Sequence, residues 1–329
     1  MNILGSTGLV VSRIGLGLAA LGRPAYITSG RDRDLGDDRS VEAMERRCYA
    51  MLDAAWSSGI RYVDAARSYG LAEQFLASWL HMRQLPEDAI VIGSKWGYEY
   101  VGGWRMDAPV HEVKDLSVDA LRKQHAESRA LLGSRLRLYQ IHSATLESGV
   151  LEDRAVIGEL AGLRSRGLAI GLTVTGPNQA ETIRHAMTIA VDGVDLFQTV
   201  QATWNLLETS AAPALADAHA RGWGVIVKEA LANGRLTDAN GRPGDAGLVR
   251  TLNAAAAALG CTVDQLALAF VLEQPWTDMV LSGAATTEQL QSHVGALEIA
   301  LAAETRAMLA AIAEPPARYW ATRSSLPWN

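Results

Sequence analysis

The sequence predicts an α/β fold: a (β/α)8 TIM barrel with an amino-terminal β-hairpin and extra carboxy-terminal helices and a tail. The first observation is that apolar, strand-like runs alternate with helix-like segments along the whole chain, without an internal linker. The second is that Gly15-Leu-Gly17 lacks the third glycine of the fingerprint that usually follows the first strand of an open, doubly wound sheet. We therefore expect residues 1–329 to form one barrel domain.

Composition narrows the class of protein and its partners. The 329 residues are 49% hydrophobic and 20% charged, which is typical of a globular protein with a substantial core. The net charge of −6 and the dispersed basic residues give no reason to expect nucleic acid or a membrane as a partner. The chain shows neither a leader-like amino terminus nor an apolar run of the ~20 residues that a membrane span needs, so we expect a cytoplasmic protein.

The first elements can be read directly from the residue pattern. Two short apolar runs around Ser6-Thr7-Gly8 predict the hairpin, and residues 13–19 predict the first strand. Residues 22–40 are polar and rich in turn formers, so we expect a long, flexible surface loop there. Ser40 is a suitable N-cap for the helix that follows at residues 41–56.

The alternation then continues to the carboxy terminus. Residues 96–116 and 232–247 are expected as long connecting segments, and the tail at 315–329 as irregular chain. We expect the remaining strands from residue 62 and at residues 89–95, 136–142, 168–174, 193–201, 223–228 and 278–281. We expect helices, among others, at residues 71–80, 117–132, 150–166, 248–258, 263–273, 287–297 and 303–312.

Ionisable side chains stand at the carboxyl ends of three successive strands. Asp64 follows the apolar start of the second strand, and Tyr69 lies in the loop five residues later. Lys95 ends the third strand and His142 ends the fourth. Since active sites of barrels lie at the carboxyl ends of the strands, we expect these side chains to converge.

These four side chains suit the reduction of a carbonyl by hydride transfer. The carbonyl oxygen needs a proton, and a phenol with an ordinary pKa of about 10 is a weak acid at neutral pH. Lys95 can lower that pKa by stabilising the phenolate, and Asp64 can hold the ammonium in place. His142 can donate a hydrogen bond to the carbonyl oxygen or relay a proton. Tyr69 is then the general acid in reduction and the general base in alcohol oxidation.

The order of these residues resembles the aldo-keto reductase superfamily over nearly the whole chain. The family carries an Asp and a Tyr around the second strand, a Lys at the end of the third and a His at the end of the fourth. Residues 4–17 resemble its amino-terminal hairpin and first strand, and residues 282–290 resemble its adenine-side cofactor loop. The resemblance implies a nicotinamide cofactor and catalytic roles for Asp64, Tyr69, Lys95 and His142.

The resemblance also implies where the cofactor binds. Gln201 matches the glutamine that grips the carboxamide, whereas the family's Ser-Asn pair is Thr173-Val174 here. Lys228 and Glu229 stand where many relatives place an aromatic residue against the nicotinamide. The expected cofactor-binding residues are Gly17, Leu18, Thr173, Gln201, Lys228, Glu229, Leu231, Ala232, Arg242, Gly283, Ala285, Gln289 and His293.

The substrate pocket is expected from the long loops and the tail, because the family builds its pocket from them. Trp96 and Trp104 are candidate walls, with the alternative that both cap the barrel. Trp204 is a candidate substitute for the missing nicotinamide-stacking aromatic.

NADP(H) is expected over NAD(H), because the family leans toward the phosphorylated cofactor; NAD(H) remains an alternative. Residues 282–293 contain no Lys or Arg, so the nearest candidates for the 2′-phosphate are Arg235 and Arg242 in the loop after the seventh strand.

The predicted function is an NAD(P)-dependent oxidoreductase that transfers hydride between nicotinamide and an aldehyde, ketone or sugar carbonyl. One alternative is an aldose or alcohol dehydrogenase that runs the same site in the oxidative direction. Another is a dinucleotide-binding regulatory subunit with little turnover, which the intact set of four residues disfavours. We expect a small-molecule substrate and no metal, and we leave an oligomer open.

Overall fold

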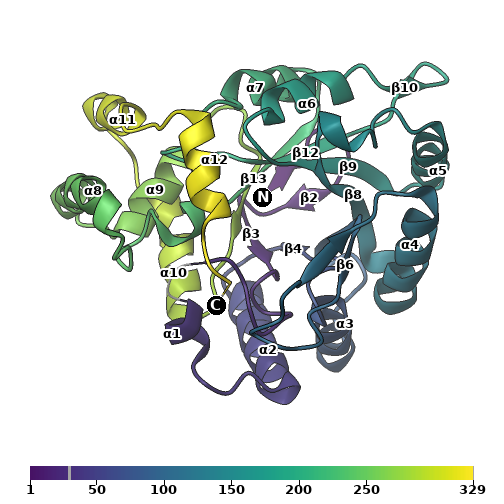
Figure 1. Cartoon of the computed structure of the whole chain (residues 1–329), viewed down its shortest axis with the longest axis horizontal. Coiled ribbons are helices and arrows are strands. Elements are labelled where there is room, and N and C mark those ends of the chain that lie inside the picture. Colours follow the sequence, from purple (N-terminus) through teal and green to yellow (C-terminus); the bar gives the residue numbers. More distant parts are fainter. Residues whose placement is uncertain (29–30, 329) are drawn as a thin grey trace.

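The computed structural model describes residues 1–28 and 31–328, and its centre is a closed barrel of parallel strands (Figure 1). Pairing of Val280 with Ile14 joins the last strand to the first and closes the ring. Around the barrel the strands are β3 (Ile14–Gly17), β4 (Tyr62–Asp64), β5 (Val91–Trp96), β8 (Leu136–Ala144), β9 (Ala169–Val174), β12 (Thr199–Thr203), β13 (Gly224–Lys228) and β14 (Met279–Ser282). The predicted (β/α)8 fold is confirmed.

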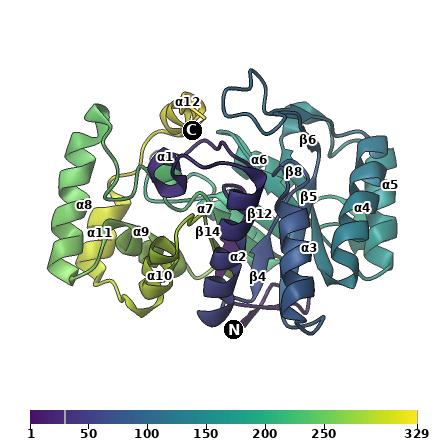
Figure 2. The same ribbon diagram turned by 90° about the horizontal axis from the view of Figure 1, so that it is seen from below.

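Helices surround the barrel on its outside (Figures 1 and 2). The Ser40 hydroxyl accepts a hydrogen bond from the Ala43 backbone N–H at 3.3 Å, so the predicted N-cap is confirmed. The outer helices are α2 (Val41–Ser57), α3 (Ala72–Arg83), α4 (Val118–Leu132), α5 (Arg154–Ser165), α6 (Gln179–Ala186), α7 (Ala212–Ala220), α8 (Ala246–Leu259), α9 (Val263–Leu272) and α10 (Thr287–Gly295). Within the described ranges, no single helix is both long and apolar enough to cross a membrane, although one bent pair, Pro243–Leu259 with Val263–Leu272, meets these criteria with an 81° bend.

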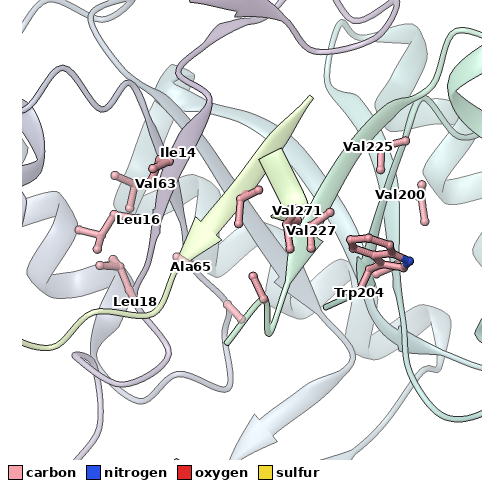
Figure 3. Close-up of a cluster of buried hydrophobic side chains, with 14 of the residues drawn as sticks. Ile14, Leu16, Leu18, Val63, Ala65, Val200, Trp204, Val225, Val227 and Val271 are labelled. Carbon is pink, nitrogen blue, oxygen red and sulfur yellow. The ribbon is translucent and has the colours of Figure 1, made fainter. Parts of the chain in front are cut away.

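The strands carry two cores because alternate residues face opposite sides of a sheet. Val225 and Val227 of β13 belong to the large core between strands and helices, part of which Figure 3 shows. Ile226, between them, belongs to a smaller core inside the barrel. This alternation fixes which side chains of each strand point inward, toward the barrel axis.

The amino-terminal hairpin closes one end of the barrel. The hairpin pairs β1 (Asn2–Ile3) with β2 (Val10–Val11), as the sequence predicts. Leu4 is fully buried in the inner core, and Gly224 at the start of β13 is so close that an added Cβ would lie 2.6 Å from the Leu4 side chain. Figure 2 shows the amino terminus at the bottom of the molecule and the carboxy terminus at the top.

Two of the predicted loops contain short regular elements. The segment at 22–40 includes α1 (Arg31–Leu35), and its residues 29–30 lie outside the described residues. The segment at 96–116 forms an antiparallel ribbon of β6 (Tyr98–Tyr100) and β7 (Glu112–Lys114). Strands of three residues are too short to give a clear periodic signal, so sequence reasoning missed them. The remaining short elements are β10 (Ala190–Val191), β11 (Val194–Asp195), η1 (Gly133–Arg135), η2 (Leu146–Ser148), η3 (Ala232–Gly234), η4 (Pro243–Asp245) and η5 (Ala296–Glu298).

The tail is helical, so the expectation of an irregular tail is wrong. After α11 (Ala303–Ala310) the chain forms α12 (Pro316–Ser324), with proline at the helix start, where its missing N–H costs nothing. Tyr319 and Trp320 are buried, and the Tyr319 hydroxyl accepts a hydrogen bond from the Asn205 amide at 3.0 Å. These contacts hold α12 over the top of the barrel in Figure 2.

Candidate active site

The period of two along each strand explains why the predicted residues meet. Tyr62 and Val91 belong to the core inside the barrel. Asp64 lies two residues after Tyr62, and Lys95 lies four residues after Val91, so both side chains also face the axis. The same spacing applies to Leu138 and His142, to Ala169 and Thr173, and to Ile226 and Lys228. All of them therefore gather above the inner core, at the carboxyl end of the barrel.

A buried ion pair lies at the floor of this site. The Lys95 ammonium donates hydrogen bonds to Asp64 Oδ2 and, at 2.9 Å, to the Ala65 carbonyl oxygen. The other oxygen, Asp64 Oδ1, accepts from the Gln201 amide at 3.0 Å and from the Tyr62 hydroxyl at 3.3 Å. Lys95 and Asp64 are 1% and 2% exposed, so the surrounding dielectric is low and both charges depend on these partners. The ion pair consequently holds the Lys95 ammonium in a fixed position beside the site.

Tyr69 and His142 lie against this pair. The Lys95 ammonium nitrogen is 4.7 Å from the centroid of the Tyr69 ring. The His142 ring packs edge to face on the Tyr69 ring, with a distance of 5.6 Å between the ring centroids. Gly70, with φ +60°, turns the chain immediately after Tyr69; an added Cβ there would lie 2.4 Å from the Gly22 carbonyl oxygen. The structure therefore brings all four predicted catalytic residues together.

Burial decides the protonation of the phenol and the imidazole. Burial and the Asp64 carboxylate raise the pKa of Tyr69 well above its ordinary value, although Arg23 acts in the opposite direction. Burial, followed by the cations Lys95 and Lys228, lowers the pKa of His142 well below its ordinary value. At neutral pH Tyr69 therefore holds its proton and His142 is uncharged. The expected lowering of the phenol pKa by a cation is outweighed by burial.

A cavity of about 440 Å³ opens above these residues and extends along the barrel rim to the start of α10. Asp64, Tyr69 and Gln201 lie at its inner end, and Gly283 and Gln289 lie at its outer end. The expected cofactor residues that line it are Gly17, Gln201, Lys228, Glu229, Leu231, Gly283, Gln289 and His293. Those that are not among its described lining residues are Leu18, Thr173, Ala232, Ala285 and Arg242. Thr173 is instead occupied in the barrel wall, where its hydroxyl accepts from the Ser143 N–H at 2.7 Å.

Charged side chains, Lys228 and Glu229, stand at the carboxyl end of β13. The Lys228 ammonium donates to the Thr203 hydroxyl at 2.9 Å, and burial lowers the pKa of Lys228 to about 8. Glu229 is ion-paired with Arg323 of α12 at 2.5 Å. Burial acts to raise the pKa of Glu229, but Arg323 and Lys228 outweigh it and hold that pKa at about 2. A cation and a carboxylate, Lys228 and Glu229, therefore border the inner cavity side by side, and α12 supplies the ion-pair partner of Glu229.

The three tryptophans expected at the substrate pocket pack in the core or in the wall around the barrel. Trp96 is fully buried in the main core, and Trp204 stacks on Phe270 with a centroid distance of 5.6 Å. Trp104 packs edge to face on Phe75 and donates its indole N–H to the Arg39 carbonyl at 2.7 Å. Of the residues described as lining the two cavities, none is one of these tryptophans, because packing and hydrogen bonds hold them in the wall.

A second cavity of about 500 Å³ lies between the β6–β7 ribbon and the tail. The β6–β7 ribbon and the tail form it, with Tyr98 and Trp328 among its lining residues. The Tyr98 ring packs edge to face on the His142 ring with a centroid distance of 5.0 Å, and the Trp328 ring stacks on the His111 ring with a centroid distance of 4.3 Å. Sequence reasoning anticipated a tail contribution but missed the ribbon, which brings Tyr98 against His142.

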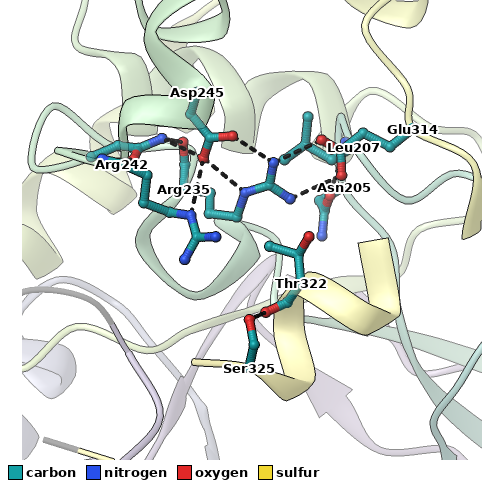
Figure 4. A network of polar contacts seen from close by, with 9 residues as sticks. Asn205, Leu207, Arg235, Arg242, Asp245, Glu314, Thr322 and Ser325 are labelled. Atoms are coloured by element: carbon teal, nitrogen blue, oxygen red, sulfur yellow. Dashed lines mark hydrogen bonds and ion pairs between the residues drawn. The ribbon is translucent and has the colours of Figure 1, made fainter. Parts of the chain in front are cut away.

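Arg235 is a structural residue, which corrects its expected role at a cofactor phosphate (Figure 4). Its side chain is 4% exposed and bonds Asp245 at 2.9 and 2.8 Å and Glu314 at 2.9 and 2.7 Å. These bonds use most of the guanidinium's N–H groups. The Arg242 guanidinium lies 3.7 Å from the same Asp245. Arg235 thus ties the loop after β13 to the segment that leads into α12.

Comparison with known proteins identifies the family of this chain. A model of the aldo/keto reductase family matches residues 13–314. The NADH-specific methylglyoxal reductase of Escherichia coli K12 is 25% identical over 339 residues, covering 94% of this chain and 97% of that protein. A D-threo-aldose 1-dehydrogenase of a Pseudomonas species is 29% identical over 252 residues, covering 71% of each chain.

The fold comparison agrees with the sequence comparison. The holo form of an aldo-keto reductase from Bacillus halodurans superposes with a TM-score of 0.73 at 21% identity, covering 95% of this chain and 96% of that one. At this identity the likeness establishes the barrel and not the substrate. With the family model matched from the first barrel strand to just before α12, the chain belongs to the aldo/keto reductase family and is an oxidoreductase.

Proposed function

We propose that this oxidoreductase interconverts the carbonyl and alcohol forms of a small aldehyde, ketone or sugar, with Tyr69 as the general acid and base. The observation that carries the proposal is the placement of the Tyr69 ring against the ammonium of Lys95, which is itself fixed by Asp64. A phenol beside a fixed cation can give up a proton and hold the resulting negative charge.

Members of the family use nicotinamide cofactors, and the residues of the larger cavity suit one. The cavity is continuous from Tyr69 to Gly283, where an added Cβ would meet nothing within 4 Å, so a large group can approach the backbone closely. Gln201 would meet the carboxamide end, and Gln289 would meet the adenosine end. When bound, the dinucleotide supplies or accepts the hydride at the carbonyl carbon.

The protein's own residues manage the proton. In reduction, Tyr69 donates its phenolic proton to the substrate oxygen, and Lys95 stabilises the phenolate that forms. His142, neutral at pH 7, donates a hydrogen bond to the same oxygen and orients the carbonyl toward the hydride. In oxidation, the phenolate takes the alcohol proton back.

We further infer that NAD(H) is the preferred dinucleotide, in place of the NADP(H) that the family resemblance favours. Of the described residues that line the larger cavity, Lys228 is the one Lys or Arg, and it lies at the inner end. Acidic side chains line the outer end: Asp238, Asp264 and Glu288. Burial and the neighbouring Asp264 raise the pKa of Asp238, so these carboxylates are close enough to repel one another and a 2′-phosphate.

This preference can be tested by binding alone. We expect tighter binding of NADH than of NADPH in a fluorescence titration of the wild type. Gln289→Arg places a cation at the outer end of the cavity and should tighten NADPH binding by about tenfold, with little effect on NADH. Gln291→Arg, at an exposed position of the same helix, is the matched control. Tighter NADPH binding by the wild type would restore the original expectation.

The substrate remains a small carbonyl or sugar, in a single-barrel protein that we place in the cytoplasm. Of the two relatives named above, one is a reductase and the other a dehydrogenase, so they indicate opposite directions of the reaction. The test is a panel of aldehydes, ketones and aldoses, assayed in both directions with both dinucleotides. Turnover of at least one member supports the proposal; tight dinucleotide binding with no turnover of any member would favour a regulatory role instead.

A further inference from the structure

A second buried cation lies beside Tyr69. Arg23, in the loop between β3 and α1, is 2% exposed. Its guanidinium donates to the Ala19 carbonyl at 3.2 Å, the Ser68 carbonyl at 3.1 Å and the Glu112 carboxylate at 2.7 Å. A buried charge needs such partners, and these come from three separate parts of the chain. Sequence reasoning gave no role to Arg23.

Aromatic rings surround the same guanidinium. The Arg23 Cζ atom lies 5.2 Å from the centroid of the Tyr69 ring, 5.0 Å from that of Tyr26 and 4.9 Å from that of Trp328. A guanidinium within about 6 Å of an aromatic face is attracted to it, more strongly when water is excluded. The proposed general acid is thus one wall of a cation-binding aromatic cage.

The backbone holds Arg23 and Tyr69 in fixed register. The Leu71 N–H donates to the Gly22 carbonyl at 2.7 Å. Gly22 approaches so closely that an added Cβ would lie 2.2 Å from the Tyr69 carbonyl oxygen. The segment before Arg23 and the turn after Tyr69 therefore cannot separate without losing this contact, and the cation cannot drift away from the phenol.

The charge around Tyr69 is mixed. Burial and the Asp64 carboxylate raise the pKa of Tyr69, Arg23 lowers it, and Glu112 and Glu229 raise it further. The titratable and charged groups that face Tyr69 from the packed elements are Asp64, Lys95, His142, Arg23, Tyr26, Tyr62, Glu112 and Glu229. Arg23 and Glu112 thus oppose each other at Tyr69 while forming one ion pair.

We propose that Arg23 is a positioning residue that orients the Tyr69 ring and, together with Lys95, stabilises negative charge on its oxygen, with Glu112 moderating this effect. The inference rests on the proposed function of Tyr69. It assigns to the Arg23–Glu112 pair an effect that a purely structural ion pair lacks: removing one partner and removing the other must act in opposite directions on Tyr69.

The test compares Arg23→Met with Glu112→Gln, since both break the same ion pair. Tyrosine labelled with ¹³C at Cζ reports the ionisation of Tyr69 by NMR, with the signal assigned by Tyr69→Phe. We expect Arg23→Met to move the Tyr69 titration to higher pH and Glu112→Gln to move it to lower pH. The rate of alcohol oxidation below the pKa follows the phenolate fraction, so kcat/KM should fall and rise respectively, about tenfold for each pKa unit.

Arg23→Lys keeps the charge and should stay near the wild-type titration. If Arg23→Met fails to fold, Glu112→Gln and Arg23→Lys still decide the matter, because Glu112→Gln must lower the titration pH. Shifts of both variants in one direction, or no shift in Glu112→Gln, would overturn the inference. The NMR titration needs no turnover, so its outcome is separate from that of the proposed function, which fails if Tyr69→Phe retains full activity.

Discussion

At the scale of single residues, one saturated ion pair organises the site. The Asp64 carboxylate receives hydrogen bonds from Lys95, Gln201 and Tyr62, so neither its position nor its charge can change easily. This arrangement holds the Lys95 ammonium 4.7 Å from the Tyr69 ring centroid. Electrostatic stabilisation by a group that is already in place costs no reorganisation during the reaction.

Lys95→Met tests the cation directly. We expect carbonyl reduction to fall on the order of 100-fold or more, because the phenolate of Tyr69 loses its nearest fixed positive charge. The basic limb of the pH–rate profile should move to higher pH, since the pKa of Tyr69 rises further. Lys114→Met, which removes a cation from the nearby ribbon, is the control. Retained activity with an unchanged profile would show that Lys95 is only structural.

The sequence predicts some of these residues and not others for a physical reason. Asp64, Lys95 and His142 are visible because each ends a strand, and the barrel converts that position into proximity. The role of Arg23 is not visible in the sequence because two of its hydrogen-bond partners, Ser68 and Glu112, come from distant segments. Trp96 and Trp204 could not be placed from the sequence, because a large aromatic in the wall of a barrel and one in a pocket look the same there.

At the scale of elements, α12 fastens the carboxy terminus to the site. Arg323 of α12 pairs with Glu229, which directly follows β13, and the side chain of Glu229 is 8% exposed. Since two prolines precede the buried Tyr319 and Trp320 and a run of polar residues follows them, the sequence pattern resembles an irregular tail. The helix is stabilised by tertiary contacts rather than by its own propensity, so truncation after Ala313 should damage folding and not only substrate choice.

Arg323→Met should lower the free energy of unfolding at pH 7 by on the order of 3 kcal/mol, because Glu229 is left as a buried, unpaired carboxylate. The pKa of Glu229 falls from its ordinary value of 4.5 to about 2 in the folded protein. Its contribution is therefore complete above pH 4.5 and is lost as the pH falls toward 2. The stability gap between wild type and variant should narrow over that range.

The measurement is urea unfolding at several pH values, with Arg318→Met, an exposed arginine on the same helix, as the control. A stability gap that does not change with pH, or an equal loss in Arg318→Met, would contradict the role of the Glu229 charge.

At the scale of the whole molecule, the residues that stabilise the barrel and the residues proposed for catalysis lie at opposite ends of it. The hairpin and the inner core occupy the amino-terminal end, and the charged residues occupy the carboxyl end. The sequence was sufficient to predict the barrel, because eight successive strand–helix units are compatible with few other folds. It was insufficient for the ribbon of β6 and β7, whose strands of three residues are too short to give a periodic signal.

Leu4→Ala tests this separation. Leu4 is fully buried, so the truncation should cost about 2–5 kcal/mol of unfolding free energy by leaving a cavity. Since the hairpin is at the far end from Tyr69, kcat/KM should stay near that of the wild type. Ile3→Ala, at a position that is 59% exposed, should change neither quantity. A large loss of activity in folded Leu4→Ala would show that the two ends are coupled.

The central claim is that Tyr69 is the general acid and base, and one comparison tests it most directly. Tyr69→Phe and Tyr98→Phe each remove a hydroxyl from a ring that contacts His142, but only Tyr69 also lies against Lys95. We measure kcat/KM for carbonyl reduction together with the Kd for NADH. The account predicts a ~100-fold to 10,000-fold loss of kcat/KM in Tyr69→Phe, near-normal NADH binding in both variants, and a small effect in Tyr98→Phe. Turnover by Tyr69→Phe at the wild-type rate would contradict it.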